Sequence, residues 1–312
     1  MNTDARDGVS GSGMGFAVAA YLLWGILPIL FFALRDSGAP EIVAWRIVLS
    51  LVFCVLVITV TRGWGRLVAI FKDRRTMLSL ALAAAFILVN WTVYVFASVS
   101  GHVVEASLGY FTNPIVTVLL GVIVLRERLR PLQWVALGTS VVAVLVIAIG
   151  YGAFPWIAIA LAFSFGFYGL VKKQVGPKAD AVSGLAIETA VLAPAATVAL
   201  VVIALTSGLS FGSLGAGHTA LMLSLGVATS IPLILFAAAA RRLPLIYLGL
   251  VQYIAPILQL IVGVVLLHEE MPLERWIGFG IVWLALVLLT VDMFLAAGRQ
   301  RGAALPEAPG AP

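Results

Sequence analysis

Long uncharged apolar runs, separated by short polar segments rich in Lys and Arg, organise this chain. Residues 14–34 and 76–104 contain no charged side chain, and the same is true of the longer runs 131–171 and 189–240. A helix needs about 20 apolar residues to cross the hydrocarbon core of a bilayer. Each of the two longest runs therefore holds two helices with a turn between them.

The pattern predicts an all-α membrane protein with ten transmembrane helices. Residues 150–155 and 207–218 supply the turns inside the two longest runs, because Gly, Pro and Ser cluster there. The predicted spans are 14–34, 41–60, 77–99, 104–124, 131–150, 153–171, 181–205, 218–240, 245–267 and 275–296. Polar residues 1–13 form a predicted N-terminal tail, and residues 297–312 a predicted disordered C-terminal tail.

Composition supports a membrane class and argues against several others. The chain is 62% hydrophobic and only 11% charged, whereas soluble domains are about 25% charged. The net charge of +5 does not indicate nucleic-acid binding, because the basic residues lie in short clusters between spans. Cys54 is the single cysteine, the three histidines are scattered, and no Gly-Lys-Ser/Thr phosphate loop is present. We therefore expect no metal, no cofactor and no enzymatic activity.

The distribution of Lys and Arg predicts the orientation. With the N-terminus in the cytoplasm, 16 of the 19 basic residues fall on the cytoplasmic side, Arg35 and Arg275 fall outside, and Arg46 lies within a span. Cytoplasmic loops carry such an excess of positive charge. Both termini are therefore predicted to be cytoplasmic.

The two halves of the chain partly repeat each other, over residues 14–150 and 151–296. At an offset of 142 positions, Pro114, Ile115, Gly121, Val122, Leu125, Glu127 and Trp134 match Pro256, Ile257, Gly263, Val264, Leu267, Glu269 and Trp276. The copies lie five helices apart, so they are predicted to have opposite orientations. Inverted repeats of this kind are typical of secondary transporters.

Several polar and aromatic motifs lie within or beside the predicted spans. The most specific is Glu105-Ala106-Ser107-Leu108-Gly109-Tyr110-Phe111. Others are Asn90-Trp91, Asn113-Pro114, Phe167-Tyr168-Gly169-Leu170-Val171, Ile187-Glu188-Thr189, and Gln252-Tyr253-Ile254 with Pro256. Together they resemble the RarD group of EamA-type transporters in the drug/metabolite transporter superfamily. The resemblance implies two inverted five-helix repeats, a central cavity and alternating access in a bacterial cytoplasmic membrane. It does not supply a substrate.

Ionisable residues inside spans are the first candidates for function, since they are costly in lipid and face the bundle interior. Glu188 lies about 10 Å into its span and is predicted to bind a cationic group or a proton; the alternative is a structural hydrogen bond between helices. Arg46 either attracts an anionic substrate group or is a paired or snorkelling arginine. Glu105 is either a gate or proton site or a helix cap. The sequence allows Arg46 to pair with Glu188 or with Glu105. Asp292 is expected at the membrane interface.

Mid-span polar and aromatic residues form a second tier of substrate candidates. They are Asn90, Tyr110, Tyr168, Gln252 and Tyr253. Ligand pockets are largely apolar with a few placed polar groups, but such residues also bridge helices or sit at membrane interfaces. Trp24 and Gly25 suggest a close-packing site. Pro114 and Pro256, expected in the middle of equivalent helices, are hinge or gating candidates; the alternative is a static kink.

These features favour a secondary transporter of a small organic metabolite or drug-like molecule, with proton or ion coupling through Glu188 or Glu105. An intramembrane enzyme acting on a lipid-linked substrate would need clustered acids or histidines at one membrane surface. A scaffold or binding protein would have no need of an inverted repeat. The partners expected are the bilayer and a small molecule. The sequence leaves homodimer formation, the substrate and the direction of transport open.

Overall fold

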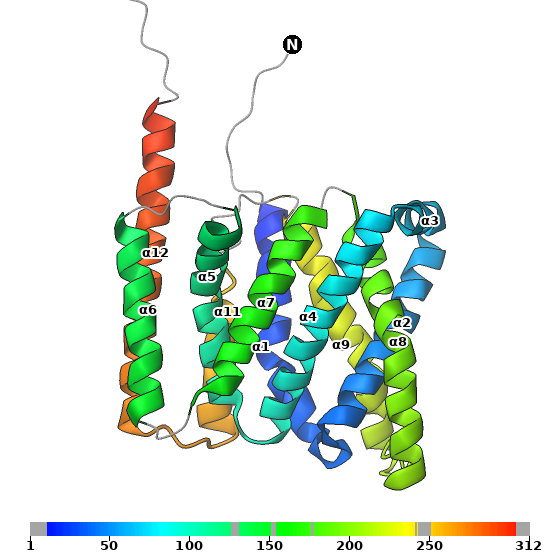
Figure 1. Ribbon diagram of the computed structural model, residues 1–312. Coiled ribbons are helices and arrows are strands. Elements are labelled where there is room, and N and C mark those ends of the chain that lie inside the picture. Colours follow the sequence, from blue (N-terminus) through cyan, green and yellow to red (C-terminus); the bar gives the residue numbers. More distant parts are fainter. Residues whose placement is uncertain are drawn as a thin grey trace, which may run out of the picture. The chain divides into compact units, whose positions relative to one another are not determined.

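The computed structural model describes residues 11–125, 131–150, 154–175, 178–240, 242 and 251–303, and these residues form helices and turns without any strand (Figure 1). The elements are α1 (Gly11–Ala33), η1 (Arg35–Ser37), α2 (Gly38–Val60), α3 (Trp64–Lys72), α4 (Arg74–Val99), α5 (Val103–Leu125), α6 (Pro131–Gly150), α7 (Trp156–Val175), α8 (Ala181–Thr206), α9 (Ala216–Ala240), α11 (Ile254–Ile261), η2 (Val262–Leu266) and α12 (Leu273–Ala303). The expected all-α class is confirmed for the described residues.

Six helices of the described chain are long and apolar enough to cross a membrane. They span Gly11–Ala33, Arg35–Val60, Arg74–Val99, Ala181–Thr206, Ala216–Phe236 and Leu273–Asp292, and shorter apolar helices cover Trp134–Ala143, Trp156–Lys172 and Ile254–Leu266. Each expected span thus coincides at least partly with a helix. Length and composition support a multi-pass membrane protein, while the count of ten crossings remains a prediction.

Four elements depart from the expected spans by more than three residues. The short amphipathic helix α3 lies in a segment expected to be a loop. Helix α7 continues to Val175, beyond the expected end at 171, and α12 continues to Ala303, into the expected C-terminal tail. The expected span 245–267 is described only from residue 251: a turn at Gln252 and Tyr253 precedes α11, which passes into the five-residue π-helix η2. Residues 126–130, including Glu127, lie outside the described residues.

The helices form two compact units, and neither unit is one half of the sequence. Unit 1 contains residues 1–120 and 155–270, and unit 2 contains residues 121–154 and 271–312. In unit 2, α6 and α12 pack along each other. These are the fifth helices of the two predicted repeats. Both units therefore combine elements from both halves of the chain.

Unit 1 has two ends, which we name after residues that mark them. At the Asp73 end, α4 and α8 begin, and the Lys178 ammonium donates to the Asp73 carboxylate at 2.8 Å. At the His218 end, α2 and α9 begin, and Ser37 Oγ lies 2.8 Å from His218 Nε2. Figure 1 shows the Asp73 end of this unit at the top and the His218 end at the bottom.

Glycines let three helix pairs of unit 1 approach closely. A Cβ on Gly226 of α9 would lie 2.6 Å from the Leu49 carbonyl oxygen of α2, and one on Gly109 of α5 would lie 2.8 Å from the Ala158 oxygen of α7. A Cβ on Gly25 of α1 would lie 2.6 Å from the Leu258 Cβ of α11, so the expected close packing at Gly25 is confirmed. Small residues at helix contacts are typical of membrane bundles, where backbone proximity replaces a hydrophobic driving force.

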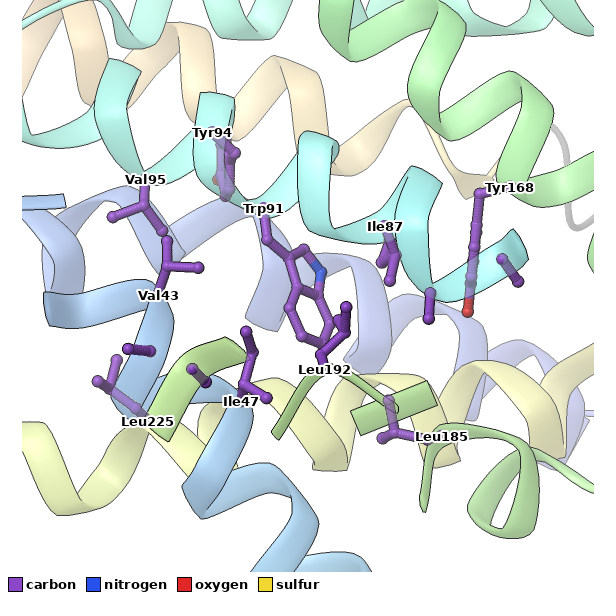
Figure 2. Close-up of a cluster of buried hydrophobic side chains, with 14 of the residues drawn as sticks. Val43, Ile47, Ile87, Trp91, Tyr94, Val95, Tyr168, Leu185, Leu192 and Leu225 are labelled. Atoms are coloured by element: carbon purple, nitrogen blue, oxygen red, sulfur yellow. The ribbon is translucent and has the colours of Figure 1, made fainter. Parts of the chain in front are cut away.

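One large apolar cluster fills the interior of unit 1, with side chains from α1, α2, α4, α7, α8 and α9. Figure 2 shows Trp91 extending from α4 toward Ile47 of α2 and Leu192 of α8. Tyr168 of α7 belongs to the same cluster. Arg46, Asn90 and Glu188 are buried beside members of this cluster.

Candidate functional site

Arg46 lies inside unit 1 and is only 3% exposed. Its Nε donates a hydrogen bond to Thr229 Oγ1 of α9 at 2.8 Å. Its guanidinium carbon lies 4.4 Å from the Trp91 ring centroid and 5.3 Å from that of Phe31. Contacts of this kind attract the cation to the ring faces. Nη1 has no hydrogen-bond partner among the described residues.

Glu188 of α8 is completely buried and forms an ion pair with Lys172 of α7. The Lys172 ammonium lies 2.7 Å from Oε1, and the Tyr168 hydroxyl donates to Oε2 at 3.2 Å. Tyr168 and Lys172 are four residues apart and share one face of α7. Gly184 gives the ammonium access to the carboxylate, since a Cβ there would lie 2.9 Å from Lys172 Nζ.

Asn90 and Tyr110 are also brought together. The Tyr110 hydroxyl donates to Asn90 Oδ1 at 3.0 Å, and Asn90 Nδ2 donates to the Leu161 carbonyl at 3.3 Å and to Ser164 Oγ at 3.2 Å. Asn90 is 2% exposed. This network joins α4, α5 and α7, so Asn90 satisfies its polar groups inside the bundle, as a buried amide must.

A chain of aromatic contacts connects the surroundings of Arg46 with those of Glu188. Ring centroids lie 5.8 Å apart for Phe31 and Tyr94, 5.4 Å for Tyr94 and Tyr110, 6.0 Å for Tyr110 and Phe165, and 5.9 Å for Phe165 and Tyr168. Edge-to-face geometry predominates, which is favourable for aromatic pairs. We call Arg46, Glu188, Lys172 and these five rings the central cluster.

Neither expected ion pair of Arg46 is formed. Arg46 bonds to Thr229 and Glu188 bonds to Lys172. Glu105 opens α5 and accepts a hydrogen bond at 3.2 Å from the backbone N–H of Ile157, in the first turn of α7. Glu105 therefore caps the start of the neighbouring helix α7. A helix cap was one of its two expected roles, but the cap was expected on its own helix. Asp292 is buried in unit 2, and its expected position at the membrane interface stays a prediction.

Gln252, Tyr253 and Pro256 lie together, outside the central cluster. Gln252 lies in the turn before α11, Tyr253 is the N-cap of α11, and its ring stacks on Phe111 with centroids 6.5 Å apart. Pro256 lies in the first turn of α11, not in mid-helix, and its carbonyl accepts a hydrogen bond from Ser107 Oγ at 2.8 Å. Pro114 lies within α5. The hinge role of both prolines stays a prediction.

Sequence reasoning missed several polar residues of unit 1. Lys172 falls just beyond the expected span, which ends at 171; its spacing of four from Tyr168 is the signal that identifies it. Glu41 is buried, and its carboxylate accepts hydrogen bonds from the backbone N–H groups of Ser210 and Phe211 at 3.0–3.1 Å. Glu269 accepts from the N–H groups of residues 103 and 104 at 2.6 and 2.8 Å and so caps the start of α5.

Hydrogen bonds join α2 to the α8–α9 loop at the His218 end. Ser210 Oγ donates to Ser37 Oγ at 2.6 Å, and Ser37 Oγ lies 2.8 Å from His218 Nε2. The Glu41 carboxylate holds the same loop through its backbone. We call Ser37, Glu41, Ser210 and His218 the His218-end network. It ties the starts of α2 and α9 together.

A pocket with a volume of about 310 Å³ lies between α2, α8 and α9 at the Asp73 end. All three helices line it: α2 with Val57, Ile58 and Thr61, α8 with Ala181 to Ser183, and α9 with Ile234 and Ala238. Its charged lining residues are Arg66, Asp180 and Arg242. These three helices also carry Arg46, Glu188 and Thr229. The pocket therefore opens between helices that carry two members of the central cluster, Arg46 and Glu188, and the Thr229 partner of Arg46.

Two acidic residues at the Asp73 end are held ionised by their surroundings. The pKa of Asp73 is lowered well below its usual range, first by the Lys178 ammonium and then by Thr76. For Asp180, burial raises the pKa, but hydrogen bonds from the Ser183 hydroxyl and backbone N–H outweigh it, so the net shift is downward. Both carboxylates cap helix starts, α4 and α8 respectively, where the helix dipole favours negative charge.

Comparison with known proteins identifies the family to which this chain belongs. Residues 11–149 match the EamA-like transporter family. The chain is 47% identical over 290 residues to Protein RarD of Streptomyces exfoliatus, covering 93% of this chain and 91% of that protein. It is 38% identical over 287 residues to Protein RarD of Escherichia coli K12, with 92% and 96% covered. An uncharacterized transporter of Vibrio cholerae is 37% identical over 303 residues, with 97% and 99% covered.

A solved crystal structure of another protein is similar in fold. It has 18% sequence identity and a TM-score of 0.59, and the match covers 90% of this chain and 96% of that one. The relatives and the apolar helices together indicate a multi-pass membrane transporter of the bacterial inner membrane. The chain belongs to the RarD group of EamA-type transporters, within the drug/metabolite transporter superfamily.

Proposed function

We propose that the protein moves a small organic molecule across the inner membrane by alternating access around the central cluster. One observation carries this proposal. Arg46 and Glu188 are buried inside a membrane bundle that is built from both halves of the sequence, and Glu188 is paired there with the Lys172 ammonium. Charged groups at membrane depth are expensive and mark transport pathways. A scaffold would gain nothing from them.

The proposal includes ten crossings in two inverted five-helix repeats, residues 14–150 and 151–296. The matched segments around Pro114 and Pro256 lie in α5 and α11, and these helices run in opposite directions. Val104, near the start of α5, packs on Gly263 beyond the end of α11, whereas Phe111, further along α5, stacks on Tyr253 at the start of α11. Antiparallel neighbours of this kind support an inverted repeat.

We assign the Asp73 end to the cytoplasm, with both termini on that side. Several basic residues lie at this end of unit 1: Arg62, Arg66, Lys72, Arg74, Arg75, Lys178 and Arg242. Arg35 lies at the His218 end. This asymmetry agrees with the positive-inside rule. The pocket at the Asp73 end and the His218-end network then correspond to a state that is partly open inward and closed outward.

Glu188 is the coupling site in this proposal. Its carboxylate is buried, but its partner Lys172 has a side chain that is 29% exposed. A proton arriving at Glu188 would release the ammonium toward the Asp73 end and remove one buried charge. Protonation and the Lys172 contact are therefore alternative ways to neutralise Glu188. Glu105 is less suited to this role, because its carboxylate caps α7.

Untargeted uptake tests the proposal without requiring that the substrate be known. Proteoliposomes are incubated with an isotopically labelled bacterial metabolite extract under an imposed pH gradient, and their contents are measured by mass spectrometry. We expect a small set of labelled metabolites to accumulate above protein-free liposomes, and Glu188→Gln to abolish the dependence on the gradient. Identical contents with and without protein would contradict transport; gradient dependence in Glu188→Gln would contradict only the coupling role.

A further inference from the structure

Resting on the proposed function, we infer that the substrate is a small organic anion whose carboxylate binds Arg46 together with Ser50 and Ser230, and that it enters through the pocket at the Asp73 end. The Glu188–Lys172 pair is neutral as a unit, whereas Arg46 has no carboxylate within ion-pair distance in the described chain. Buried charges are normally paired, so the cluster has one positive charge to be matched.

No described side chain supplies that match. The titratable neighbours of Arg46 are the phenols of Tyr94 and Tyr110. Glu41, the other charged residue of α2, lies about 7.5 Å away along the helix axis and uses its carboxylate on the amides of residues 210 and 211. The faces of the guanidinium contact two aromatic rings, one of them that of Trp91. Nε donates to Thr229, whereas Nη1 has no partner among the described residues. Nη1 is therefore left for a ligand, and guanidinium N–H groups form strong hydrogen bonds to carboxylates.

Two hydroxyl groups beside Arg46 also lack partners. Ser50 of α2 and Ser230 of α9 are completely buried, and neither Oγ has an oxygen or nitrogen partner in the described residues. The Cys54 thiol interacts with Ser230, but a thiol is only a weak donor and acceptor. Ser50 lies one helical turn from Arg46 on the same face, and Ser230 follows Thr229, which bonds Arg46. Buried polar groups without strong partners are rare in native structures, and Arg46, Ser50 and Ser230 each carry a donor that a carboxylate can accept.

Arg46 and the pocket lie along one face of α2. Ile58 lines the pocket, and Cys54, Ser50 and Arg46 follow at intervals of four residues, all of them buried. The distance from Ile58 to Arg46 is about 18 Å along the helix. The pocket is lined by two arginines and one aspartate, so its charge is net positive. A groove of that sign concentrates anions at its mouth.

The structural alternative is that Arg46 stabilises the bundle through Thr229 and the two rings. The two roles predict opposite effects on stability. If Arg46 is retained for a ligand, the unliganded protein carries an unmatched buried charge, and Arg46→Gln leaves the melting temperature unchanged or raises it. If Arg46 is structural, Arg46→Gln lowers the melting temperature. Thr229→Val is the matched control, since it removes the hydrogen bond to Nε and keeps the charge.

The test measures melting of the full-length protein in nanodiscs with benzoate, benzamide and benzylammonium, which share a ring and differ in charge, and with chloride as an inorganic anion. We expect benzoate to stabilise the protein and the other three to have no effect. Apparent affinity for benzoate should fall about tenfold or more in Arg46→Gln, a loss of about 1.4 kcal/mol, fall less in Ser50→Ala and Ser230→Ala, and be partly retained in Arg46→Lys. Equal stabilisation by benzamide, stabilisation by chloride alone, or benzoate binding that survives Arg46→Gln would overturn the inference.

The labelled-extract assay separates this inference from the proposed function. Organic anions that accumulate in wild-type proteoliposomes and are lost in Arg46→Gln support both. Accumulation of cations or neutral metabolites overturns the anion assignment and leaves transport intact. Absence of any accumulation overturns transport, and then benzoate binding decides whether Arg46 is an anion site in a protein of another function.

Discussion

The Lys172 ammonium lies 2.7 Å from the Glu188 carboxylate, and the two side chains differ sharply in exposure, 29% against 1%. This asymmetry predicts unequal effects of removing either partner. Lys172→Gln leaves a buried carboxylate without a cation, a change that typically costs about 3–5 kcal/mol. Glu188→Gln leaves an ammonium that can reach solvent and should cost much less. Thermal melting of both single variants and of the double variant measures the difference.

The double variant gives the control for this pair. We expect Lys172→Gln with Glu188→Gln to be more stable than Lys172→Gln alone, because the unpaired carboxylate is gone. Strict additivity of the two single effects would show that the side chains are not coupled.

Gly226 permits the contact of α9 with α2, since a Cβ there would lie 2.6 Å from the Leu49 carbonyl oxygen. We expect Gly226→Ala to destabilise the protein by about 1–3 kcal/mol, the usual cost of overpacking. Gly169→Ala is the matched control: a Cβ on Gly169 of α7 would meet nothing within 4 Å, and alanine in a helix interior is favourable by about 0.5–1 kcal/mol. Equal melting temperatures of the two variants would contradict this packing.

Asp73 predicts a pH dependence at the Asp73 end. Its pKa in the folded protein is lowered by Lys178 and Thr76, so its contribution to stability is present above the unfolded pKa of about 3.9 and is lost as the pH falls through the folded value. The melting temperature of the wild type should therefore fall more than that of Asp73→Asn between about pH 6 and pH 3. Parallel curves for the two proteins would exclude the contribution.

Removing the Glu269 carboxylate should destabilise the start of α5, which is far away in sequence. Its carboxylate accepts the Val103 and Val104 N–H groups, which have no partner within α5 because they open the helix. Glu269→Ala should cost about 1 kcal/mol, as loss of an N-terminal cap does. Hydrogen exchange should increase at Val103 and Val104. Glu270→Ala, at the neighbouring exposed position, serves as the control and should leave exchange at these amides unchanged.

The sequence was most informative about features that the bilayer imposes. Apolar run length predicted the all-α class and the positions of the helices, because a membrane span has a fixed minimum length. It was less informative at helix ends. Helix α7 continues past Lys172, and the ammonium of Lys172 contacts Glu188. Hydropathy cannot reveal such a tertiary contact.

The sequence predicted several residues of the candidate site, but not which side chains contact each other there. Arg46, Glu188, Asn90, Tyr110 and Tyr168 all lie inside unit 1, as expected of polar residues in spans. Their partners depend on which helices are neighbours, and that arrangement brought a threonine of α9 to Arg46 and a serine of α7 to Asn90. Gln252 and Tyr253 lie outside the central cluster, because the chain turns before α11. Hydropathy and helix-breaking residues did not distinguish that turn from a continuous helix.

Locking the His218 end tests alternating access most directly. Ser37 Oγ and Ser210 Oγ lie 2.6 Å apart, so Ser37→Cys with Ser210→Cys in a Cys54→Ser background places two sulfurs within reach of a disulfide. Uptake from the labelled extract is compared before oxidation, after oxidation and after reduction, with each single-cysteine variant as control. Alternating access predicts that uptake stops on oxidation of the double variant alone and returns on reduction. Undiminished uptake by a fully cross-linked protein would contradict it.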